Sequence, residues 1–475
     1  TAVWMLAAAA LLPVGALLNL NRPREPRPLG SAVLALDPGA AGTAAAMALN
    51  GEIKPLTLEN MQRVLLRGPF AGRCNEEFLP SAPLNGVCFS AWEAFAENAA
   101  QEPLLDGHRY MPTGVEIACA KDAEGLHYGF GTSCRTEKAR ETRGLFLRQL
   151  MTEAVLAAHA AGATDVSWRI ALPETARSQR QSYFTQMQTL AAQISEDTGI
   201  PLTENVPPVQ WAEESDAIHA YFLHDDQLHA QASFLTLDIG GNSANLGLCS
   251  GTEGEHTARF TVPMGMHTLL DGLRTHPERL TEDFDRVLDH PQLLRDVRAL
   301  AKKLAQTRDA GKGRLLLDLF LGGHLYPLSR HMNQYYEQNR CTYTQACLLQ
   351  GFAELLTLLG AFRDHLGASA DLPVCLAGRG ALWLQRLSPE LKENLGAFLS
   401  AGNGAPAPTL YMSAAPKQEI VQGLLHLTHL HHDMPQEADI TDAPTVSEAA
   451  FLARFREALP QAAQRLQTES AASPA

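Results

Sequence analysis

One pattern occurs twice in this chain, at positions far apart in the sequence. An apolar run of strand type ends at an Asp, and a turn rich in small residues follows. The first copy is Ala32–Leu36 with Asp37, and the second is Phe234–Leu237 with Asp238. A further apolar run follows each turn, so each copy is predicted to be a β-hairpin. A single Asp-Gly turn has little weight, because both residues are common in turns. Two copies in equivalent settings favour a paired functional element.

The residue types in these turns suit one kind of chemistry. Glycine lets the backbone approach a phosphate closely, and successive N–H groups then form a concave anion site. A carboxylate at the end of the strand holds the water shell of a Mg²⁺ that contacts the phosphate. Each copy also carries a hydroxyl, from Thr43 in the first and Ser243 in the second. Two such turns that faced each other would hold a polyphosphate from both sides.

Three more segments support this interpretation. Trp211–Leu223 is predicted to be a helix with an acidic start, placed just before the second copy. Val374–Leu384 is an apolar strand that ends in Gly-Arg-Gly and enters a helix, a geometry suited to a flat base or a ribose. Pro416–Leu425 is predicted to be a helix in which Gly423 permits close packing.

Charge and cysteine content narrow the choice of partner and compartment. The formal net charge is −14, and the sequence has no stripe of Lys and Arg. This is unlike a nucleic-acid-binding protein, although small anions bound by backbone amides remain compatible with it. The 8 cysteines are scattered without a CxxC pair, which is typical of a reducing compartment. We therefore expect the bulk of the chain to be cytoplasmic.

The two ends differ from the rest. Residues 4–20 are apolar apart from Asn19 and are followed by three arginines within a Pro-rich linker up to residue 30. This segment is at the lower limit of what spans a bilayer, and the arginines would keep its C-terminal side in the cytoplasm. We expect a membrane anchor that tethers the chain to the inner face of the membrane, and the alternatives are a buried helix and a cleaved segment. Near the other end, residues 446–467 have an amphipathic helical pattern.

The order of these motifs resembles the superfamily of actins, seventy-kilodalton heat-shock chaperones and sugar kinases. LALDPGAAGT is similar to the first phosphate loop of that superfamily, LDIGGNSANL to the second, and LAGRGALW to the adenosine motif. AEESDAIHAY resembles the chaperones' acidic helix ahead of the second loop. The likeness covers residues 31–432, and the chaperone nucleotide-binding domain is the nearest branch.

This resemblance implies a two-lobed α/β fold, made of duplicated ribonuclease H-like lobes with a deep interlobe cleft. ATP and Mg²⁺ would lie at the floor of that cleft, and lobe rotation would follow the nucleotide state. The expected parts are an N-terminal segment and linker (1–30), lobe I (31–231), lobe II (232–410) with a helical insert (269–339), a helix returning to lobe I (411–435), and a C-terminal tail (436–475).

The resemblance also assigns roles to residues. Asp37 and Asp238 would hold the Mg²⁺ and act in catalysis, and Glu213 matches the chaperones' glutamate near the attacking water, with Glu214 as the second choice. The nucleotide would contact residues of all three motifs: Gly39, Ala40, Ala41, Thr43, Gly240, Gly241, Asn242, Ser243, Gly378, Arg379 and Gly380.

The sequence departs from the superfamily pattern in ways that favour binding over fast hydrolysis. Ala40 and Ala41 replace hydroxyl or amide residues after the first Asp-x-Gly, so side-chain donors are missing there. No lysine lies between Lys54 and Lys121 to match the chaperones' phosphate-contacting lysine, and Arg379 stands where a second glycine is common. We therefore expect weak ATPase activity at most.

Four functions remain open at this point. The favoured one is a chaperone-like, nucleotide-gated protein that binds ATP or ADP and an unknown protein partner. About fifty residues follow Leu425, which is too few for a peptide-binding sandwich with a lid. The alternatives are an actin-like filament former, a small-molecule kinase that needs a further Asp as base, and a degenerate member that binds no nucleotide.

Overall fold

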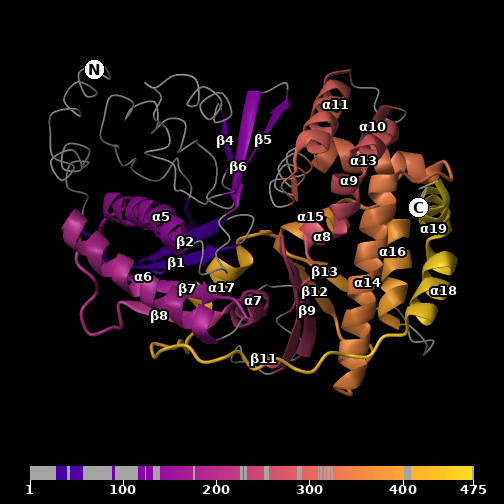
Figure 1. Cartoon of the computed structure of the whole chain (residues 1–475). Coiled ribbons are helices and arrows are strands. Elements are labelled where there is room, and N and C mark those ends of the chain that lie inside the picture. The colour runs from indigo at the N-terminus through magenta and orange to yellow at the C-terminus, as the bar shows by residue number, and fades with distance from the viewer. Residues whose placement is uncertain are drawn as a thin grey trace. The chain divides into compact units, whose positions relative to one another are not determined.

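The computed structural model describes most of the chain as two compact units (Figure 1). The described residues are 28–39, 43–56, 88–90, 116–122, 125–131, 140–174, 177–224, 228, 233–250, 256–285, 291–308, parts of 310–321, 325–400 and 408–472. Of these, unit 1 holds those up to Cys119 and those in Gly125–Tyr221 and Gln418–Ala438. Unit 2 holds those in Ala120–Glu124, Phe222–Lys417 and Asp439–Ala475.

Unit 1 is built on a five-stranded mixed sheet with the strand order β3-β2-β1-β7-β8. The strands are β1 (Gly30–Pro38), β2 (Thr43–Leu49), β3 (Glu52–Pro55), β7 (Ala163–Leu172) and β8 (Val209–Glu213). The first three form an antiparallel meander, whereas β7 pairs with β1 and β8 in parallel. Two parallel neighbouring strands must be joined by a crossover connection. The helix α5 (Arg140–Ala160) lies in the connection that leads to β7, and α6 (Arg177–Thr198) lies in the connection from β7 to β8.

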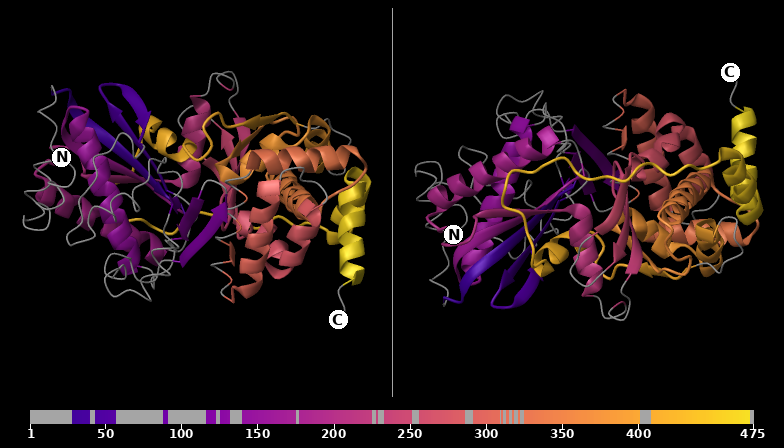
Figure 2. Two further views of the ribbon diagram at one scale, coloured as in Figure 1. Left: turned by 90° about the horizontal axis from the view of Figure 1, so that it is seen from above. Right: turned by 90° about the horizontal axis from the view of Figure 1, so that it is seen from below.

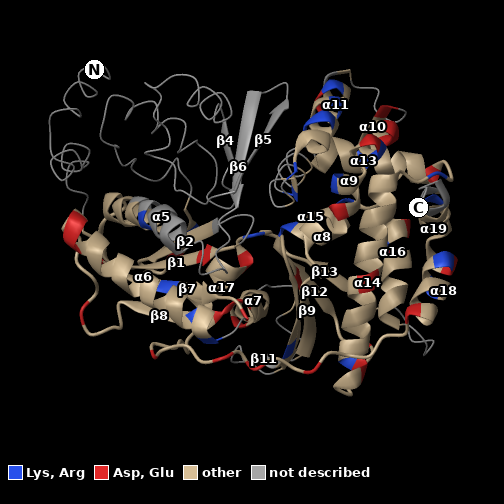
Figure 3. Cartoon of the chain, viewed as in Figure 1, with Lys and Arg blue, Asp and Glu red and all other residues tan. Residues whose placement is uncertain are grey.

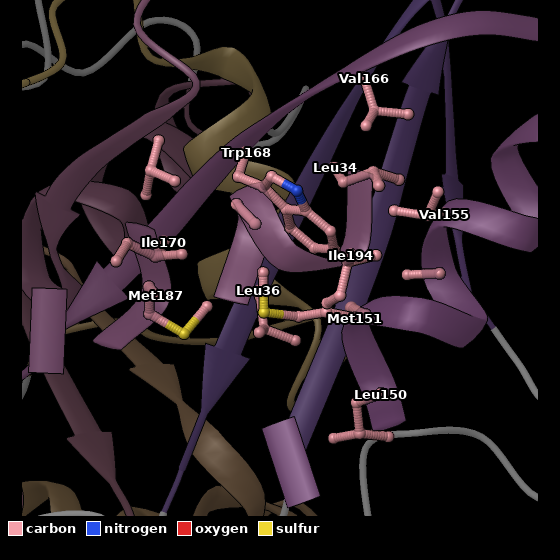
Figure 4. Packing of buried hydrophobic residues seen from close by; sticks show 14 of the residues in the cluster. Leu34, Leu36, Leu150, Met151, Val155, Val166, Trp168, Ile170, Met187 and Ile194 are labelled. Atoms are coloured by element: carbon pink, nitrogen blue, oxygen red, sulfur yellow. The ribbon is translucent and has the colours of Figure 1, made fainter. Parts of the chain in front are cut away.

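The core of unit 1 lies between this sheet and the two helices α5 and α6 (Figure 4). Alternate residues of β7, among them Trp168 and Ile170, face the helices and meet Met151 of α5 and Met187 of α6. These side chains are almost fully buried. Arg169 lies between Trp168 and Ile170 and therefore points to the opposite face of the sheet.

The opposite face is covered by α17 (Glu419–His426). The Arg169 guanidinium donates to the carbonyls of Leu424, Leu425 and Leu427 at 2.7, 3.1 and 3.1 Å, and so satisfies groups that the end of this helix leaves open. A Cβ on Gly423 would collide with the carbonyl oxygen of Ala217. The close packing expected at Gly423 is therefore confirmed.

Unit 2 repeats the sheet of unit 1. Its strand order is β11-β10-β9-β12-β13, with an antiparallel meander followed by two parallel neighbours. The strands are β9 (Ser233–Ile239), β10 (Ala244–Ser250), β11 (His256–Val262), β12 (Val374–Ala377) and β13 (Leu410–Met412). The α/β fold of two duplicated halves, predicted from the twin hairpins and the resemblance, is therefore confirmed.

Most helices of unit 2 lie between β11 and β12 in the chain, where the sequence predicts a helical insert at 269–339. They include α8 (Met266–Leu269), α9 (Asp271–Thr275), α10 (Pro277–Asp285), α11 (Pro291–Gln306), α13 (Leu325–Glu337) and α14 (Tyr343–His365). Basic and acidic side chains are interspersed on them (Figure 3), and Arg298 of α11 pairs with Asp285 of α10 at 2.8 Å.

Among the described residues, α14 alone is long and apolar enough to pass a test for a membrane span. Most of the apolar stretch of α14 is buried inside unit 2. There the helix packs against α10, α16 (Pro389–Gly396), α18 (Glu448–Ala458) and α19 (Pro460–Ala472). This burial is typical of a core helix. The apolar segment 4–20 lies outside the described residues.

The C-terminal segment is bound to each unit in turn (Figure 2). In unit 1, Trp211 and His431 exchange two backbone hydrogen bonds of 2.8 and 2.9 Å. In unit 2, the Thr441 N–H donates to the Arg259 carbonyl at 2.7 Å, and Arg259 Nε donates to the Asp439 carbonyl at 2.8 Å. These contacts cover the edge strands β8 and β11.

The amphipathic pattern of residues 446–467 predicts one helix, but the structure has two. The helix α18 ends at Ala458, and α19 begins at Pro460. Proline lacks the N–H that a continuous helix needs and disfavours helical geometry in the preceding residue, so the break at Leu459 has a local cause. Phe451 and Phe455 of α18 stack on each other and pack against Phe398.

Candidate functional site

Asp238 lies at the point of unit 2 where the strand order reverses. It is the second-last residue of β9, which pairs with the preceding meander on one side and with the later strand β12 on the other. In the register, Asp238 is opposite Asn245 of β10 and Ala377 of β12. Its side chain is buried. Ligands of open α/β sheets bind at the carboxyl ends of strands at such a switch point.

The turn after Asp238 is held from one side by α8. The Gly240 N–H donates to the Ser243 carbonyl at 2.9 Å and closes the turn. The Gly240 carbonyl accepts from Met266 N at 2.9 Å, and the Gly241 carbonyl accepts from His267 N at 2.8 Å.

These two bonds decide where the N–H groups of the turn point. In a trans peptide unit, the C=O and the N–H point in opposite directions. Because the carbonyls of Gly240 and Gly241 point toward α8, the N–H groups of Gly241 and Asn242 point away from it. Two successive N–H groups with a common direction form an anion-binding concavity. The geometry of the turn therefore fits the phosphate loop expected from the sequence.

Glycines pack tightly around the Asp238 turn. A Cβ on Gly265 would lie 2.6 Å from the carbonyl oxygens of both Gly240 and Gly241. Gly378 has φ +78°, and a Cβ there would collide with Asp238 Oδ1 and lie 2.7 Å from the Ile239 carbonyl oxygen. A side chain at either position would thus displace the turn, so the tertiary structure itself requires glycine there.

The segment expected to bind adenosine lies directly against the Asp238 turn. The strand β12 ends at Ala377, and α15 (Gly378–Arg386) begins at once, as the sequence predicts. Gly380 of this helix faces Ile239, whose carbonyl oxygen would be 2.9 Å from an added Cβ. Arg379 is half-buried. Within unit 2, the start of α15 thus brings the predicted adenosine motif into contact with the predicted second phosphate loop.

Asp37 is the counterpart of Asp238 in unit 1. It is the second-last residue of the central strand β1, at the point where the order of this sheet reverses, and its side chain is buried. Gly39 follows the strand, and Thr43 begins β2 opposite Pro38. Ala40 and Ala41 lie outside the described residues, as does the side chain of Thr43.

Glu213 has a different setting from the one expected. It ends β8 rather than lying in a helix, because α7 (Glu214–Leu223) begins one residue later. Its Oε1 accepts a hydrogen bond of 2.8 Å from Arg180, and both side chains are buried. The Arg180 guanidinium also lies 4.9 Å from the ring centre of Trp211, a cation–π contact.

More carboxylates surround this ion pair at the carboxyl ends of β7 and β8. Glu174 follows β7, and its Oε1 accepts from the backbone N–H of Ser215 at 3.0 Å, in the first turn of α7. Burial lowers the pKa of Arg180, and the charges of Glu174 and Asp216 oppose that effect. Glu214, the second choice for the catalytic glutamate, is buried at the start of α7. In unit 1, several acidic side chains thus lie near the buried Arg180 guanidinium.

Three groups at these sites were missed or misplaced by sequence reasoning. Arg180 is buried in the first turn of α6, within the polar stretch Arg177–Gln181 that carries no recognisable motif. Gly265 and His267 lie in a segment without a marked motif. The signal for Arg180 was its helical spacing to Tyr183, Phe184 and Met187, which are buried on the same helix.

Among the described residues, no group of three or more His, Cys, Asp or Glu side chains is placed to hold a metal ion. A cation at the Asp238 turn would therefore complete its shell with water and phosphate oxygens, as Mg²⁺ commonly does.

Two sheets with one strand order, each with an Asp near the end of its central strand, define the class of protein. This duplicated α/β architecture is what the resemblance to the actin, seventy-kilodalton heat-shock chaperone and sugar kinase superfamily predicts.

The chain is similar to many solved structures, including two that differ from it strongly in sequence. No family model and no curated protein matches the chain. The ethanolamine utilization protein EutJ from Carboxydothermus hydrogenoformans is 11% identical, with a TM-score of 0.36, over 87% of this chain and 98% of that one. MreB5 of Spiroplasma citri, solved with bound ADP, is 11% identical, with a TM-score of 0.34, over 84% of this chain and 95% of that one.

Proposed function

We propose that this chain is a nucleotide-gated interaction protein that binds Mg-ATP and hydrolyses it slowly. The observation that carries the proposal is the equivalent placement of Asp37 and Asp238. Each is buried, and each is the second-last residue of the central strand in a sheet of the same order. Such positions are where open α/β sheets bind ligands.

The Asp238 turn supports the phosphate part of this proposal. The N–H groups of Gly241 and Asn242 point away from α8, in the arrangement that binds anions. Asp37 and Asp238 would hold a Mg²⁺ through its water shell, and the bound ion would neutralise charge on the phosphates. Ser243 and Gly39 flank these positions and would add a hydroxyl and a backbone contact.

The start of α15 supports binding of the nucleoside. Gly378 and Gly380 let the N-terminal turn of this helix pack closely against the Asp238 turn. We propose that ribose or base lies against this backbone, with the half-buried Arg379 beside it.

The contacts of Glu213 support slow turnover. One of its oxygens is held by Arg180 at 2.8 Å, so the carboxylate is fixed and partly occupied. A carboxylate held in this way is better suited to orient a water molecule than to remove a proton from that water. The alanines after the first Asp-x-Gly point the same way, because they offer no side-chain donor to a phosphate.

The gated role and the location complete the proposal. We propose that the partner is a protein and that the bulk of the chain lies in the cytoplasm, tethered to the inner face of the membrane through residues 4–20. The apolar character of that segment and the arginines after it support the tether. Membrane flotation of the full chain, compared with a chain lacking residues 1–28, tests this part separately.

Calorimetric titration with Mg-ATP tests the nucleotide site. We expect Asp238→Asn and Asp37→Asn each to weaken binding at least tenfold, because each loses a charge that faces the cation. Asp197→Asn is a suitable control, because Asp197 is an exposed partner of Arg148. Unchanged affinity in both aspartate variants would refute the site.

Three assays separate the proposed function from its alternatives. ATP-dependent pelleting would indicate a filament, and phosphate transfer to a sugar would indicate a kinase. A thermal shift with ATP that depends on Mg²⁺, without either activity, supports the gated binder.

A further inference from the structure

His267 makes two separate contacts with the Asp238 turn. Its backbone N–H donates to the Gly241 carbonyl at 2.8 Å, and its ring Nδ1 lies 2.9 Å from Asn242 Oδ1. An amide oxygen only accepts hydrogen bonds, so Nδ1 carries the proton. One residue therefore holds two consecutive residues of the turn.

The burial of the two partners differs sharply. The His267 ring is 7% exposed, whereas Asn242 is exposed at the tip of the turn. The ring is fixed by its surroundings, and it transfers this order to a side chain that would otherwise rotate freely. The contact therefore restricts the conformation of the tip of the turn.

We propose that His267 is a positioning residue for the polyphosphate group of a nucleoside triphosphate. It holds the Gly241 carbonyl and the Asn242 side chain, so that the Asn242 N–H, which shares a peptide unit with the Gly241 carbonyl, is oriented before the ligand arrives. This inference rests on the proposed function and adds a residue to it. Groups that are oriented in advance bind more tightly, because no conformational freedom is lost on binding.

Binding of three ligands distinguishes positioning from a general contribution to packing. ATP and ADP carry phosphates that would meet the turn, whereas adenosine does not. Loss of the Nδ1 contact should weaken ATP and ADP and leave adenosine unchanged. A purely structural role for the ring would weaken all three ligands alike or lower the melting temperature alone.

The experiment is calorimetric titration of the full chain with Mg-ATP, Mg-ADP and adenosine. His267→Phe keeps a ring of similar size but has no N–H, and we expect about fivefold weaker ATP binding, the usual effect of one lost hydrogen bond. His267→Asn places an amide near the position of Nδ1, and we expect it to restore most of the affinity. His276→Ala is the matched control, since that half-exposed histidine pairs with Glu278.

A double-mutant cycle completes the test. If His267 acts through Asn242, His267→Phe should have little further effect in an Asn242→Ala background. Equal ATP affinity of wild type and His267→Phe would overturn the inference while leaving the proposed function intact, as would fully additive losses. Absence of ATP binding by the wild-type chain would overturn both.

Discussion

The Arg180 guanidinium donates a 2.8 Å hydrogen bond to Glu213 Oε1 in the interior of unit 1, where the two side chains are 1% and 8% exposed. The partners come from the first turn of α6 and the last residue of β8. The pair therefore connects a helix and a strand at the carboxyl end of the sheet, where the site is proposed.

Breaking this ion pair should be costly. We expect Arg180→Met to lower the free energy of unfolding by about 3–5 kcal/mol, because Glu213 loses the cation that compensates its buried charge. Urea denaturation measures this change. The double variant Arg180→Met/Glu213→Met should lose less than Arg180→Met, since apolar side chains of similar volume replace a buried pair at little cost. A double variant less stable than Arg180→Met would contradict this account.

Gly378 should tolerate no side chain. We expect Gly378→Ala to cost about 3 kcal/mol or more, because a Cβ at φ +78° is strained and would also collide with the Asp238 carboxylate. Gly367→Ala is the matched control, since Gly367 has φ +65° but nothing within 4 Å of an added Cβ. It should show only the conformational strain, about 1 kcal/mol. Equal losses in the two variants would show that contact with Asp238 is unimportant.

Asp283 should make the stability of unit 2 depend on pH. Burial raises its pKa to about 6, although it accepts hydrogen bonds from the backbone of Tyr343 and Thr344 and lies 3.2 Å from Arg465. Between about pH 4 and pH 6 the folded chain holds a proton here that the unfolded chain has released. The free energy of unfolding should therefore fall as the pH rises through this window, by roughly 3 kcal/mol.

Urea denaturation at a series of pH values measures this dependence. We expect the fall to be absent in Asp283→Asn, which does not titrate. Asp285→Asn, on the same helix but exposed and paired with Arg298, should retain it. A wild-type slope that persists in Asp283→Asn would assign the effect to other groups.

The helix α18 should contribute to the stability of unit 2. Phe455 is 3% exposed and contacts both Phe398 and Phe451. We expect Phe455→Ala to cost about 3 kcal/mol, because it leaves a cavity among these rings. Arg456→Ala, at the exposed neighbouring position, should change stability by less than about 0.5 kcal/mol. Thermal unfolding followed by circular dichroism gives both values, and similar losses would contradict the packing.

Much of the fold could be predicted from short stretches of sequence. The hairpins after Asp37 and Asp238 follow from apolar runs and turn residues that are neighbours in the chain. The entry of β12 into α15 follows in the same way from an apolar strand and the Gly-Arg-Gly that ends it. The start of α7 was predicted less well: three residues assigned to a helix belong to β8, because pairing with β7 outweighs local helical preference there.

The sequence by itself therefore determined the repeated strand–Asp–turn elements, the superfamily they resemble and the position of both aspartates at strand ends. Only the tertiary structure decided that Arg180 is buried beside Glu213, that α8 orients the Asp238 turn and that position 378 has no room for a side chain. The physical reason is separation along the chain: Arg180 and Glu213 are 33 residues apart, and His267 and Asn242 are 25 apart. Local patterns report which face of an element is apolar, whereas contacts of this kind exist only once the elements have packed.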